Sequence, residues 1–231
     1  YDSNGKYITS LGRRGQGPGE FDRANGIAVM PDGRLILRDP SDQRINVYSP
    51  AGEPLAHWSL PNPISSFGSR MVTVDTSGVV YVTTTLARSF PSGPSERVTI
   101  RLSSSGRIID TVRAPTFPGA VPMLTATRPV SDGAGGAPRS AGGTTSASVP
   151  FTPAGMWAWS PLGYMVTGLP NRYAIELRIP PVPGPAPRTW QPTDPVMSIR
   201  RTVAPVPVAD AERDQRREAL ERTMRNTDPR W

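Results

Sequence analysis

The chain has 231 residues, a formal net charge of +7, 28 prolines and 22 glycines, and it contains no cysteine. The absence of cysteine excludes disulfides and thiolate-bound metals, and no apolar run reaches the roughly 18–20 residues that a bilayer-spanning helix requires. The frequent prolines and glycines exclude long helices through most of the chain. The composition therefore predicts an all-β fold of short strands joined by many turns.

The positive charge is scattered along the chain. Lys6 is the only lysine among 26 basic residues, and the arginines gather only in pairs such as Arg13–Arg14 and Arg216–Arg217. Proteins that bind nucleic acids usually concentrate basic residues on one face and interleave them with stacking aromatic residues. We therefore expect no nucleic-acid partner, whereas the charge suits an acidic protein surface or anionic lipid headgroups.

The first eleven residues read as the end of a strand-rich unit. Tyr1–Gly5 has the composition of a tight turn, and Lys6–Leu11 is predicted as the outermost strand of a preceding unit. The chain opens on tyrosine, in the middle of a motif. We therefore expect it to be processed or trimmed, with a leader or lipid anchor removed.

An internal repeat occupies most of the remaining chain. Three segments share an apolar strand, a turn with a glycine and a second apolar strand, and their turn glycines are Gly33, Gly78 and Gly163. Gly33 and Gly78 are 45 residues apart, within the ~40–50 residues of a four-stranded propeller blade. The 85 residues from Gly78 to Gly163 correspond to the same period with an insertion of about 40 residues.

Each repeat continues with an arginine and alternating apolar residues, a period-two pattern that predicts half-buried strands. These strands are Arg44–Tyr48, Arg97–Leu102 and Arg172–Leu177. In the first two repeats a further glycine turn and a fourth strand follow, and the pattern predicts four-stranded blades at roughly 24–60, 70–113 and 155–201. About three blades and one outer strand cannot close a ring of four to eight blades, so the remaining strands are expected from other residues or another chain.

Residues 11–48 carry the most specific pattern. The pattern consists of a glycine-rich loop at Leu11–Phe21, a glycine-led strand at Gly26–Val29, an Asp-Gly turn at Asp32–Gly33, Asp39, and the arginine and isoleucine that begin the third strand at Arg44–Ile45. This pattern resembles the NHL repeat of six-bladed β-propellers in secreted bacterial proteins, and Ser198–Arg213 is similar to their passage from blade to helix. The resemblance implies a propeller fold and a periplasmic or extracellular location. It implies no reaction, because propellers host many unrelated functions.

Two stretches interrupt the repeat. Residues 114–155 are rich in proline and then in glycine, alanine, serine and threonine, and such a low-complexity loop buries too little apolar area to order itself without a partner. Residues 180–195 are rich in proline and are predicted as an irregular excursion between outer strands. A polyproline II segment that binds aromatic partners is the alternative for this second stretch.

The C-terminal part contains one convincing helix, residues 210–226, with Asp210 as its predicted N-cap and Asn226 as its predicted end. Its favourable i,i+4 pairs are Glu212–Arg216, Glu218–Arg222 and Glu221–Arg225, and its thin apolar stripe is Ala211, Ala219, Leu220 and Met224. A helix this polar is predicted to face solvent. We therefore divide the chain into propeller blades at 1–201 and a C-terminal linker with a surface helix at 202–231.

Few residues suit catalysis. Gly15–Gly19 lacks the Gly-Lys-Ser/Thr of a phosphate-binding loop, and His57, the sole histidine, stands on a predicted outer strand without a nucleophile motif. Asp32, Asp39 and Asp75 recur at blade turns, where they either accept backbone hydrogen bonds or supply carboxylates to calcium or a substrate, as in lactonase-type propellers. We favour the turn-forming role and expect no catalytic residue, no metal site and no cofactor.

The sequence thus predicts a non-catalytic, protein-binding scaffold, an exported accessory subunit of a larger, membrane-associated complex. A broad face of arginine, tryptophan and proline-rich loops is expected to contact other protein subunits or anionic lipid headgroups. The residues expected at this face are Trp190, Arg188, Arg139, Arg128, Arg216 and Arg217. The alternatives are a calcium-dependent, lactonase-like hydrolase and a sensor that binds a small ligand or glycan at the propeller axis.

Overall fold

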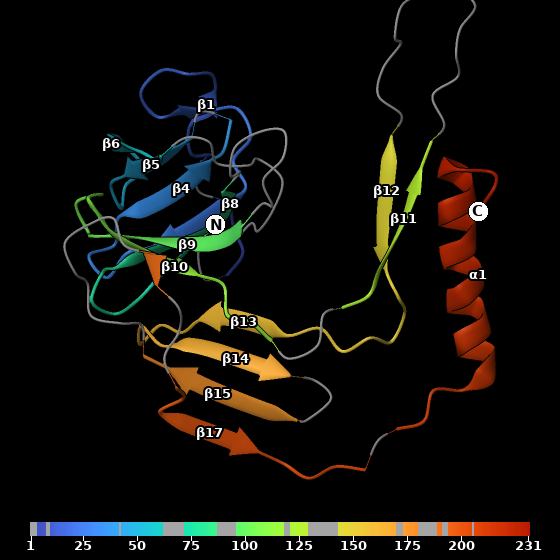
Figure 1. The fold of residues 1–231 in the computed structure, drawn as a ribbon. Coiled ribbons are helices and arrows are strands. Elements are labelled where there is room, and N and C mark those ends of the chain that lie inside the picture. The colour runs from blue at the N-terminus through green and yellow to red at the C-terminus, as the bar shows by residue number, and fades with distance from the viewer. Residues whose placement is uncertain are drawn as a thin grey trace, which may run out of the picture. The chain divides into compact units, whose positions relative to one another are not determined.

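The structure, a computed structural model, describes residues 4–7, 10–41, 43–61, 72–86, 96–117, 121–128, 143–169, 173–179, 189–190, 194–204 and 206–231. These residues form two compact units (Figure 1). Unit 1 comprises Tyr1–Thr116, Trp157–Thr167 and Ile175–Ile199, and unit 2 comprises Phe117–Met156, Gly168–Ala174 and Arg200–Trp231. Strands dominate unit 1, whereas unit 2 contains the helix.

The first sheet confirms the blade predicted at 24–60. Its four strands are antiparallel neighbours in chain order: β3 (Gly26–Val29), β4 (Leu35–Asp39), β5 (Arg44–Tyr48) and β6 (Pro54–Ser59). Gly33 and Gly52 form the connecting turns with φ of +84° and +90°, a left-handed backbone that favours glycine. Each of these glycines donates its N–H to the carbonyl three residues earlier, at 2.9 Å.

The second sheet confirms the blade predicted at 70–113 and carries one strand more than predicted. Its strands are β7 (Val72–Val74), β8 (Val80–Leu86), β9 (Glu96–Leu102), β10 (Ile108–Arg113) and β16 (Thr189–Trp190). β16 pairs in parallel with β10, with Trp190 opposite Val112. The prediction of an irregular excursion at 180–195 is therefore wrong at these two residues. Unlike the surrounding prolines, they keep the backbone N–H groups that can pair with a free strand edge.

The third sheet confirms the four strands predicted at 155–201. They are β13 (Met156–Trp159), β14 (Met165–Leu169), β15 (Ala174–Arg178) and β17 (Met197–Arg200). Gly163 turns the chain between β13 and β14 with φ of +78°, and Tyr173 has a positive φ of 46° just before β15. The turn of Gly163 repeats the hydrogen bond of the first sheet, because its N–H donates to Ser160 O at 3.0 Å.

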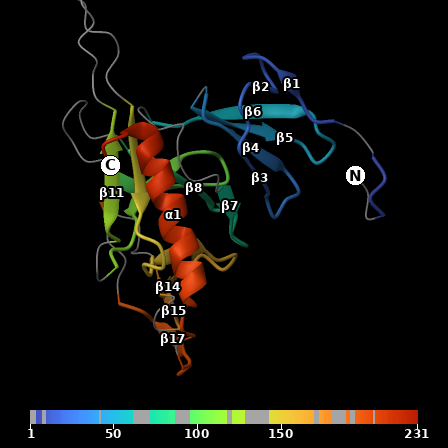
Figure 2. The ribbon, with the colours of Figure 1, turned by 90° about the vertical axis from the view of Figure 1, so that its right-hand side faces the viewer.

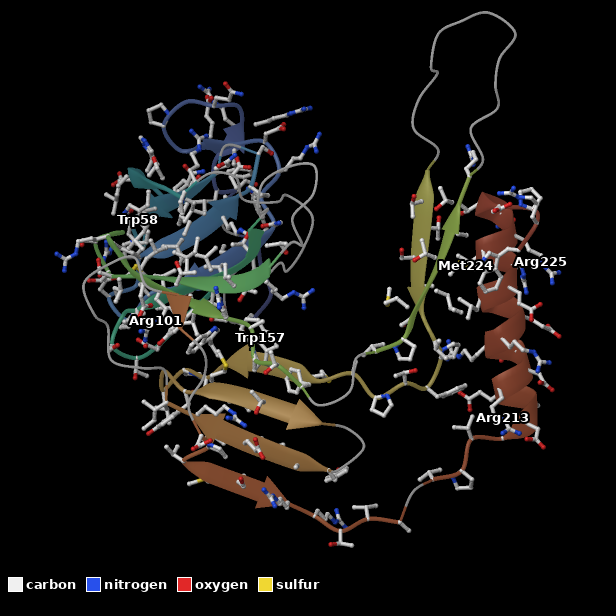
Figure 3. All side chains as sticks on the ribbon, in the orientation of Figure 1. Trp58, Arg101, Trp157, Arg213, Met224 and Arg225 are labelled. Carbon is white, nitrogen blue, oxygen red and sulfur yellow. The ribbon has the colours of Figure 1, made fainter. Side chains whose placement is uncertain are left out.

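The three sheets pack face to face in chain order. One apolar cluster lies between the first and second sheets and contains Met30, Ile36, Ile45, Val47, Trp58, Leu60, Val72, Val80, Val82, Ile100 and Leu102. A second cluster joins the second and third sheets through Tyr81, Val112, Trp159 and Met165, and Trp157 packs against it (Figure 3). Each sheet thus buries a face against its neighbour, as propeller blades do, and the described residues form part of a ring rather than a closed one.

Unit 2 contains an antiparallel hairpin of β11 (Met123–Thr127) and β12 (Thr144–Ser148), against which α1 (Asp210–Thr227) packs (Figure 2). The prediction of a loop without order of its own at 114–155 is therefore wrong for these ten residues. Threonine favours strands, and α1 supplies the buried surface that the segment lacks by itself. Ala126 is 1% exposed and Met224 of α1 is completely buried. The hairpin and α1 therefore belong to the same compact unit. The predicted division into 1–201 and 202–231 assigns them to separate parts of the chain.

The helix ends differ slightly from the predicted ones. Ala209 is the N-cap, so that Asp210 is the first helical residue, and the helix continues to Thr227. Of the three expected i,i+4 pairs, only Glu221–Arg225 is formed in the described helix, at 3.2 Å. Met224 is the one buried residue of the helix. The prediction of a largely solvated helix is confirmed.

The described N-terminal residues form a turn but no blade strand. Gly5 has φ of +79°, as expected for the turn at 1–5, whereas the described residues of 6–11 adopt no strand. A strand requires a hydrogen-bonded neighbour, and no described strand pairs with this segment. Further on, the short strands β1 (Arg13–Arg14) and β2 (Glu20–Phe21) pair in parallel and close a glycine-rich loop. Within the described part of the chain, no helix has both the length and the apolar character needed to cross a bilayer.

Candidate functional site

The six residues predicted at a partner surface fall in different parts of the molecule. Arg139 and Arg188 lie outside the described residues. The backbone of Trp190 belongs to β16 in unit 1. Arg128 follows β11 in unit 2, where it is exposed and donates its N–H to Gly143 O at 3.0 Å. Of the described members, Arg128, Arg216 and Arg217 belong to unit 2, whereas Trp190 belongs to unit 1.

Arg216 and Arg217 lie on α1 in different settings. The Arg217 guanidinium is 2.9 Å from an Asp214 carboxylate oxygen and 3.9 Å from one of Glu221. Arg216 is exposed and forms no ion pair with any described residue. Arg216 is therefore the member of the pair whose charge remains fully available to a partner.

The helix as a whole is highly charged but carries no net charge. Its five acidic residues match five arginines in number; they are Asp210, Glu212, Asp214, Glu218 and Glu221 against Arg213, Arg216, Arg217, Arg222 and Arg225. An ion pair also joins Asp210 to Arg213. The exposed side of α1 thus presents both signs of charge.

The glycine-rich loop between β1 and β2 is filled by a carboxylate of its own. The Gly17 N–H donates to Glu20 Oε2 at 2.9 Å, and Arg13 Nε donates to Glu20 Oε1 at 2.6 Å. The backbone hydrogen bond from Gly17, followed by the bond from Arg13, lowers the pKa of Glu20 below its ordinary value. The loop therefore satisfies its anion-binding groups internally, which agrees with a role in leading into the first blade rather than in binding phosphate.

Side chains of β5 fasten this loop to the first sheet. Arg44 donates from Nη1 to Gln16 O at 3.0 Å and from Nη2 to Glu20 O at 2.8 Å, and Asn46 Nδ2 donates to Glu20 O at 3.1 Å. Tyr48 OH donates to the carbonyl of Gly19 at 3.0 Å. The three side chains alternate along β5, so that all of them point to the same face.

A cavity of about 220 Å³ remains beside the loop. It is lined by Gln16, Gly17, Pro18, Gly19, Arg44, Asn46, Pro54, Leu55, Ala56 and His57. The cavity was not predicted, because Arg44 and Asn46 read as ordinary strand residues and His57 as an exposed one. His57 is indeed exposed on β6. The polar residues at alternate positions of β5 were the only sequence signal of this site.

The three blade-turn carboxylates accept hydrogen bonds in their own turns, and Asp39 also accepts them from the adjacent loop. Asp39 accepts the N–H groups of Asp22, Arg23 and Ser41 at 2.9, 3.3 and 3.1 Å. Asp32 accepts the N–H and Nε of Arg34, and the backbone bond contributes most to lowering its pKa. These contacts match the turn-forming role, in which the carboxylate satisfies backbone donors.

Asp75 accepts more hydrogen bonds than the other turn carboxylates. It accepts the N–H groups of Ser77 and Val79 at 2.9 and 3.0 Å, the Ser77 hydroxyl at 2.6 Å and the Tyr81 hydroxyl at 2.7 Å. Desolvation raises the pKa of this carboxyl, but the hydrogen bonds together outweigh it and the pKa is lowered. Burial, followed by the bond to Asp75, raises the pKa of Tyr81, so this hydroxyl remains protonated at neutral pH.

A buried polar network lies on the face of the second sheet that meets the third. The Arg101 guanidinium binds the Asp110 carboxylate in a bidentate pair, with 2.6 Å between Nε and Oδ1. Trp159 stacks on Tyr81 with ring centroids 4.4 Å apart and donates Nε1–H to Thr99 Oγ1 at 3.0 Å. These partners satisfy one another, so the network joins the second and third sheets.

Comparisons with solved structures show partial likeness at low identity. A protein of unknown function from Bacteroides caccae is 9% identical, with a TM-score of 0.31, over 77% of this chain and 60% of that chain. Virginiamycin B lyase from Staphylococcus aureus is 13% identical, with a TM-score of 0.24, over 68% of this chain and 66% of that chain. The chain spans less than two thirds of the length of either protein. No curated protein matches it.

A family model provides the strongest of the comparisons. It is the model of the DUF5128 family, described as a 6-bladed beta-propeller, and it matches residues 1–123. The match covers the glycine-rich loop, the first sheet and strands β7–β10 of the second sheet. More than half of the chain is matched, and the chain belongs to this family of six-bladed β-propellers.

Proposed function

We propose that the chain is a non-catalytic, NHL-like propeller segment that binds other protein subunits. In this proposal it is an exported accessory subunit of a membrane-associated complex, located in the periplasm or outside the cell. The observation that carries the proposal is α1, an 18-residue helix with a single buried residue. Most of its charged side chains are exposed, so their charges are available to the polar rim of a protein interface.

The NHL-like character is supported by the repeated turn geometry. Gly33, Gly78 and Gly163 have φ of +84°, +84° and +78°, and each donates its N–H to the carbonyl three residues earlier. The turns at Gly52 and Gly106 repeat the same bond. One turn conformation that recurs at corresponding positions along the chain is typical of repeat folds.

The binding role is supported by how little of α1 is used inside the chain. Helices in water gain most of their stability from packing an apolar face, and α1 packs mainly through Met224 with Leu220 half-buried. Its outer side carries both signs of charge in equal number. Such a surface complements the mixed polar rim of a protein interface better than a purely anionic lipid surface.

The non-catalytic role is supported by the hydrogen bonding of the carboxylates. Asp32, Asp39 and Asp75 accept backbone donors in their own turns or in the adjacent loop, whereas a calcium-dependent hydrolase needs such oxygens free to converge on an ion or substrate. The cavity beside His57, at about 220 Å³, is smaller than the ~300–1,000 Å³ of most ligand pockets.

Site-specific photocross-linking in the native host tests the proposal. Gln215 lies nine residues before Met224, about two and a half helical turns away, so it points to the side opposite the buried residue. With p-benzoylphenylalanine at Gln215 we expect one defined protein adduct in the cell-envelope fraction, weakened by Arg216→Glu. The matched control is the same group at His57, also exposed, from which we expect no such adduct.

Two results contradict the proposal. One is the same set of adducts, or none, from both positions. The other is calcium-dependent lactone hydrolysis by the purified protein that Asp39→Asn abolishes without unfolding it. Flotation with vesicles of phosphatidylglycerol and phosphatidylethanolamine separates the lipid alternative, because binding to these vesicles that disappears at high salt would identify headgroups as the partner.

A further inference from the structure

The cavity beside the glycine-rich loop is bounded by elements that the chain itself holds in place. The loop at Gln16–Gly19 lines one side and β6, at Pro54–His57, lines another. Arg44 and Asn46 of β5 complete the lining and fix the loop by donating to its carbonyls. The volume of about 220 Å³ is several times the ~30 Å³ that one water molecule occupies. The cavity is thus a preformed space large enough for a small molecule.

Asn46 supplies the cavity with one polar atom that the fold does not use. The residue is only 2% exposed, and its Nδ2 donates to Glu20 O. This bond fixes the orientation of the amide, because Oδ1 in the same place would set two acceptors against each other. Among the described residues, Asn46 Oδ1 accepts no hydrogen bond. Buried polar atoms are nearly always paired, so this oxygen is suited to a donor that enters the cavity.

The charges around the cavity favour a neutral ligand. Arg44 is a cation in the lining and repels an ammonium group. The Glu20 carboxylate interacts electrostatically with Arg44 and is bound by the Gly17 N–H and by Arg13. An anionic ligand would have to compete with this internal carboxylate. The donor that pairs with Asn46 Oδ1 is therefore expected on an uncharged molecule.

The remaining lining suits a flat apolar ring. Pro18, Pro54, Leu55 and Ala56 contribute apolar surface, and the proline rings are rigid. A guanidinium such as that of Arg44 also attracts the negative face of an aromatic ring. A sugar fits less well, because each of its several hydroxyl groups loses water on burial and needs a partner of its own.

We propose that this cavity binds a small, neutral aromatic compound with a single N–H or O–H donor, of the indole or phenol class. The ring packs on the apolar side chains and the Arg44 guanidinium, and the donor pairs with Asn46 Oδ1. The chain contains the same pairing elsewhere, because the Trp159 indole stacks on Tyr81 and donates to Thr99 Oγ1 at 3.0 Å. The small volume excludes larger ligands and selects a compound of one or two rings.

Titration of the ¹⁵N-labelled 231-residue protein with indole, followed by NMR, tests this proposal. We expect saturable shifts of the Asn46 side-chain amide and of the backbone amides of Gly17, Gly19 and His57, with a dissociation constant of ~1 mM or lower. Benzothiophene has nearly the same shape as indole but no N–H group. It should bind about tenfold more weakly, because Asn46 Oδ1 then loses water without gaining a donor.

A matched pair of leucine substitutions locates the site. Leu55→Ala removes apolar lining at a residue that is 56% exposed, and it should raise the dissociation constant of indole about 3–10-fold without unfolding the protein. Leu162→Ala, at a residue that is 70% exposed between β13 and β14 and outside the lining, should leave indole binding unchanged.

Asn46→Leu tests the acceptor, because it removes the oxygen with little change in volume. It should abolish the preference for indole over benzothiophene. The substitution also removes the bond to Glu20 O, so circular dichroism checks the fold of the variant. The comparison of the two ligands on the wild-type protein does not depend on this variant.

Four results would overturn the proposal. They are no saturable shift with indole at about 10 mM, tenfold above the expected limit, shifts that map away from the lining residues, equal dissociation constants for indole and benzothiophene, and indole binding that Leu55→Ala leaves unchanged. The cavity lies in unit 1 and its ligand is a small molecule. The proposal therefore stands or falls separately from the cross-linking at Gln215 of α1.

Discussion

The two units of this chain are stabilised in different ways. In unit 1, three sheets share two apolar clusters, and the polar side chains between them are buried with their partners. In unit 2, a two-stranded hairpin and a charged helix meet through a few residues, of which Met224 and Ala126 are buried. The difference shows that burial follows the number of neighbours an element has, because a middle blade is covered twice and a lone hairpin once.

The same difference in burial decides how much each charged pair contributes to the free energy of unfolding. The Arg101 and Asp110 side chains are 8% and 1% exposed, whereas those of Arg217 and Asp214 on α1 are 65% and 56% exposed. Water screens the second pair and leaves the first in a low-dielectric environment. The chain thus depends on its buried pair far more than on the ion pairs along the helix.

The largest expected effect is that of Asp110→Asn. The substitution leaves the buried Arg101 guanidinium without its counter-charge, and breaking such a pair costs about 3–5 kcal/mol. Urea denaturation followed by tryptophan fluorescence measures the loss. The control, Asp214→Asn, removes one partner from an exposed pair and should change the free energy of unfolding by less than about 1 kcal/mol. Equal losses from the two substitutions would contradict the difference between the buried and the exposed pair.

The next largest effect concerns the contact between α1 and the hairpin. Met224→Ala removes the one buried side chain of the helix, and we expect a loss near the lower end of the range for such truncations, about 2 kcal/mol. Hydrogen exchange should accelerate in α1 and β11–β12 but not in the second sheet. Met123→Ala, at a residue that is 55% exposed, should leave exchange in both units almost unchanged.

A smaller effect and a pH dependence are expected for Asp75→Asn. The amide cannot accept all four donors that surround the carboxylate, and we expect a loss of about 1–3 kcal/mol at neutral pH. The folded pKa of Asp75 lies below its ordinary value of 3.8, so its contribution is complete above that value and is lost as the pH falls through the folded pKa.

The wild type and the Asp75→Asn variant should therefore approach each other in stability in strong acid. Urea midpoints at about pH 6 and in strong acid measure this convergence. A difference that is the same at both pH values would show that the carboxylate charge is not what the turn uses. Ser77→Ala, which removes one of the four donors, is the matched milder change and should lose less at neutral pH.

The smallest effect is expected from Arg225→Gln. Its guanidinium is 3.2 Å from Glu221 and also donates to Trp231 O, but its side chain is 60% exposed. Exposed helix pairs of this spacing contribute about 0.3–0.5 kcal/mol. Thermal melts in low and high salt should show a small difference that salt removes. A loss above about 1 kcal/mol, or one insensitive to salt, would mean that this end of α1 is packed more tightly than its exposure indicates.

The positions of the blades could be predicted from the sequence because their determinants are local. Each blade sequence contains a glycine turn, two apolar strands and an arginine-led third strand. The structure places Gly33, Gly78 and Gly163 in equivalent turns. The roles of the turn aspartates were local as well, since most of the donors they accept lie within a few residues. Helix α1 was predictable to within one residue at its end from charge spacing and capping signals.

Only the tertiary structure decided the remaining features, because their partners lie far apart in the chain. The low-complexity composition around β11 and β12 predicts a loop, and α1, more than sixty residues later, supplies the surface that orders them. β16 forms a strand because its backbone pairs with the edge strand β10. Trp159 and Thr99 are sixty residues apart and meet only when two blades pack. Repetition along the sequence determined the blades, and packing between distant segments determined what covers them.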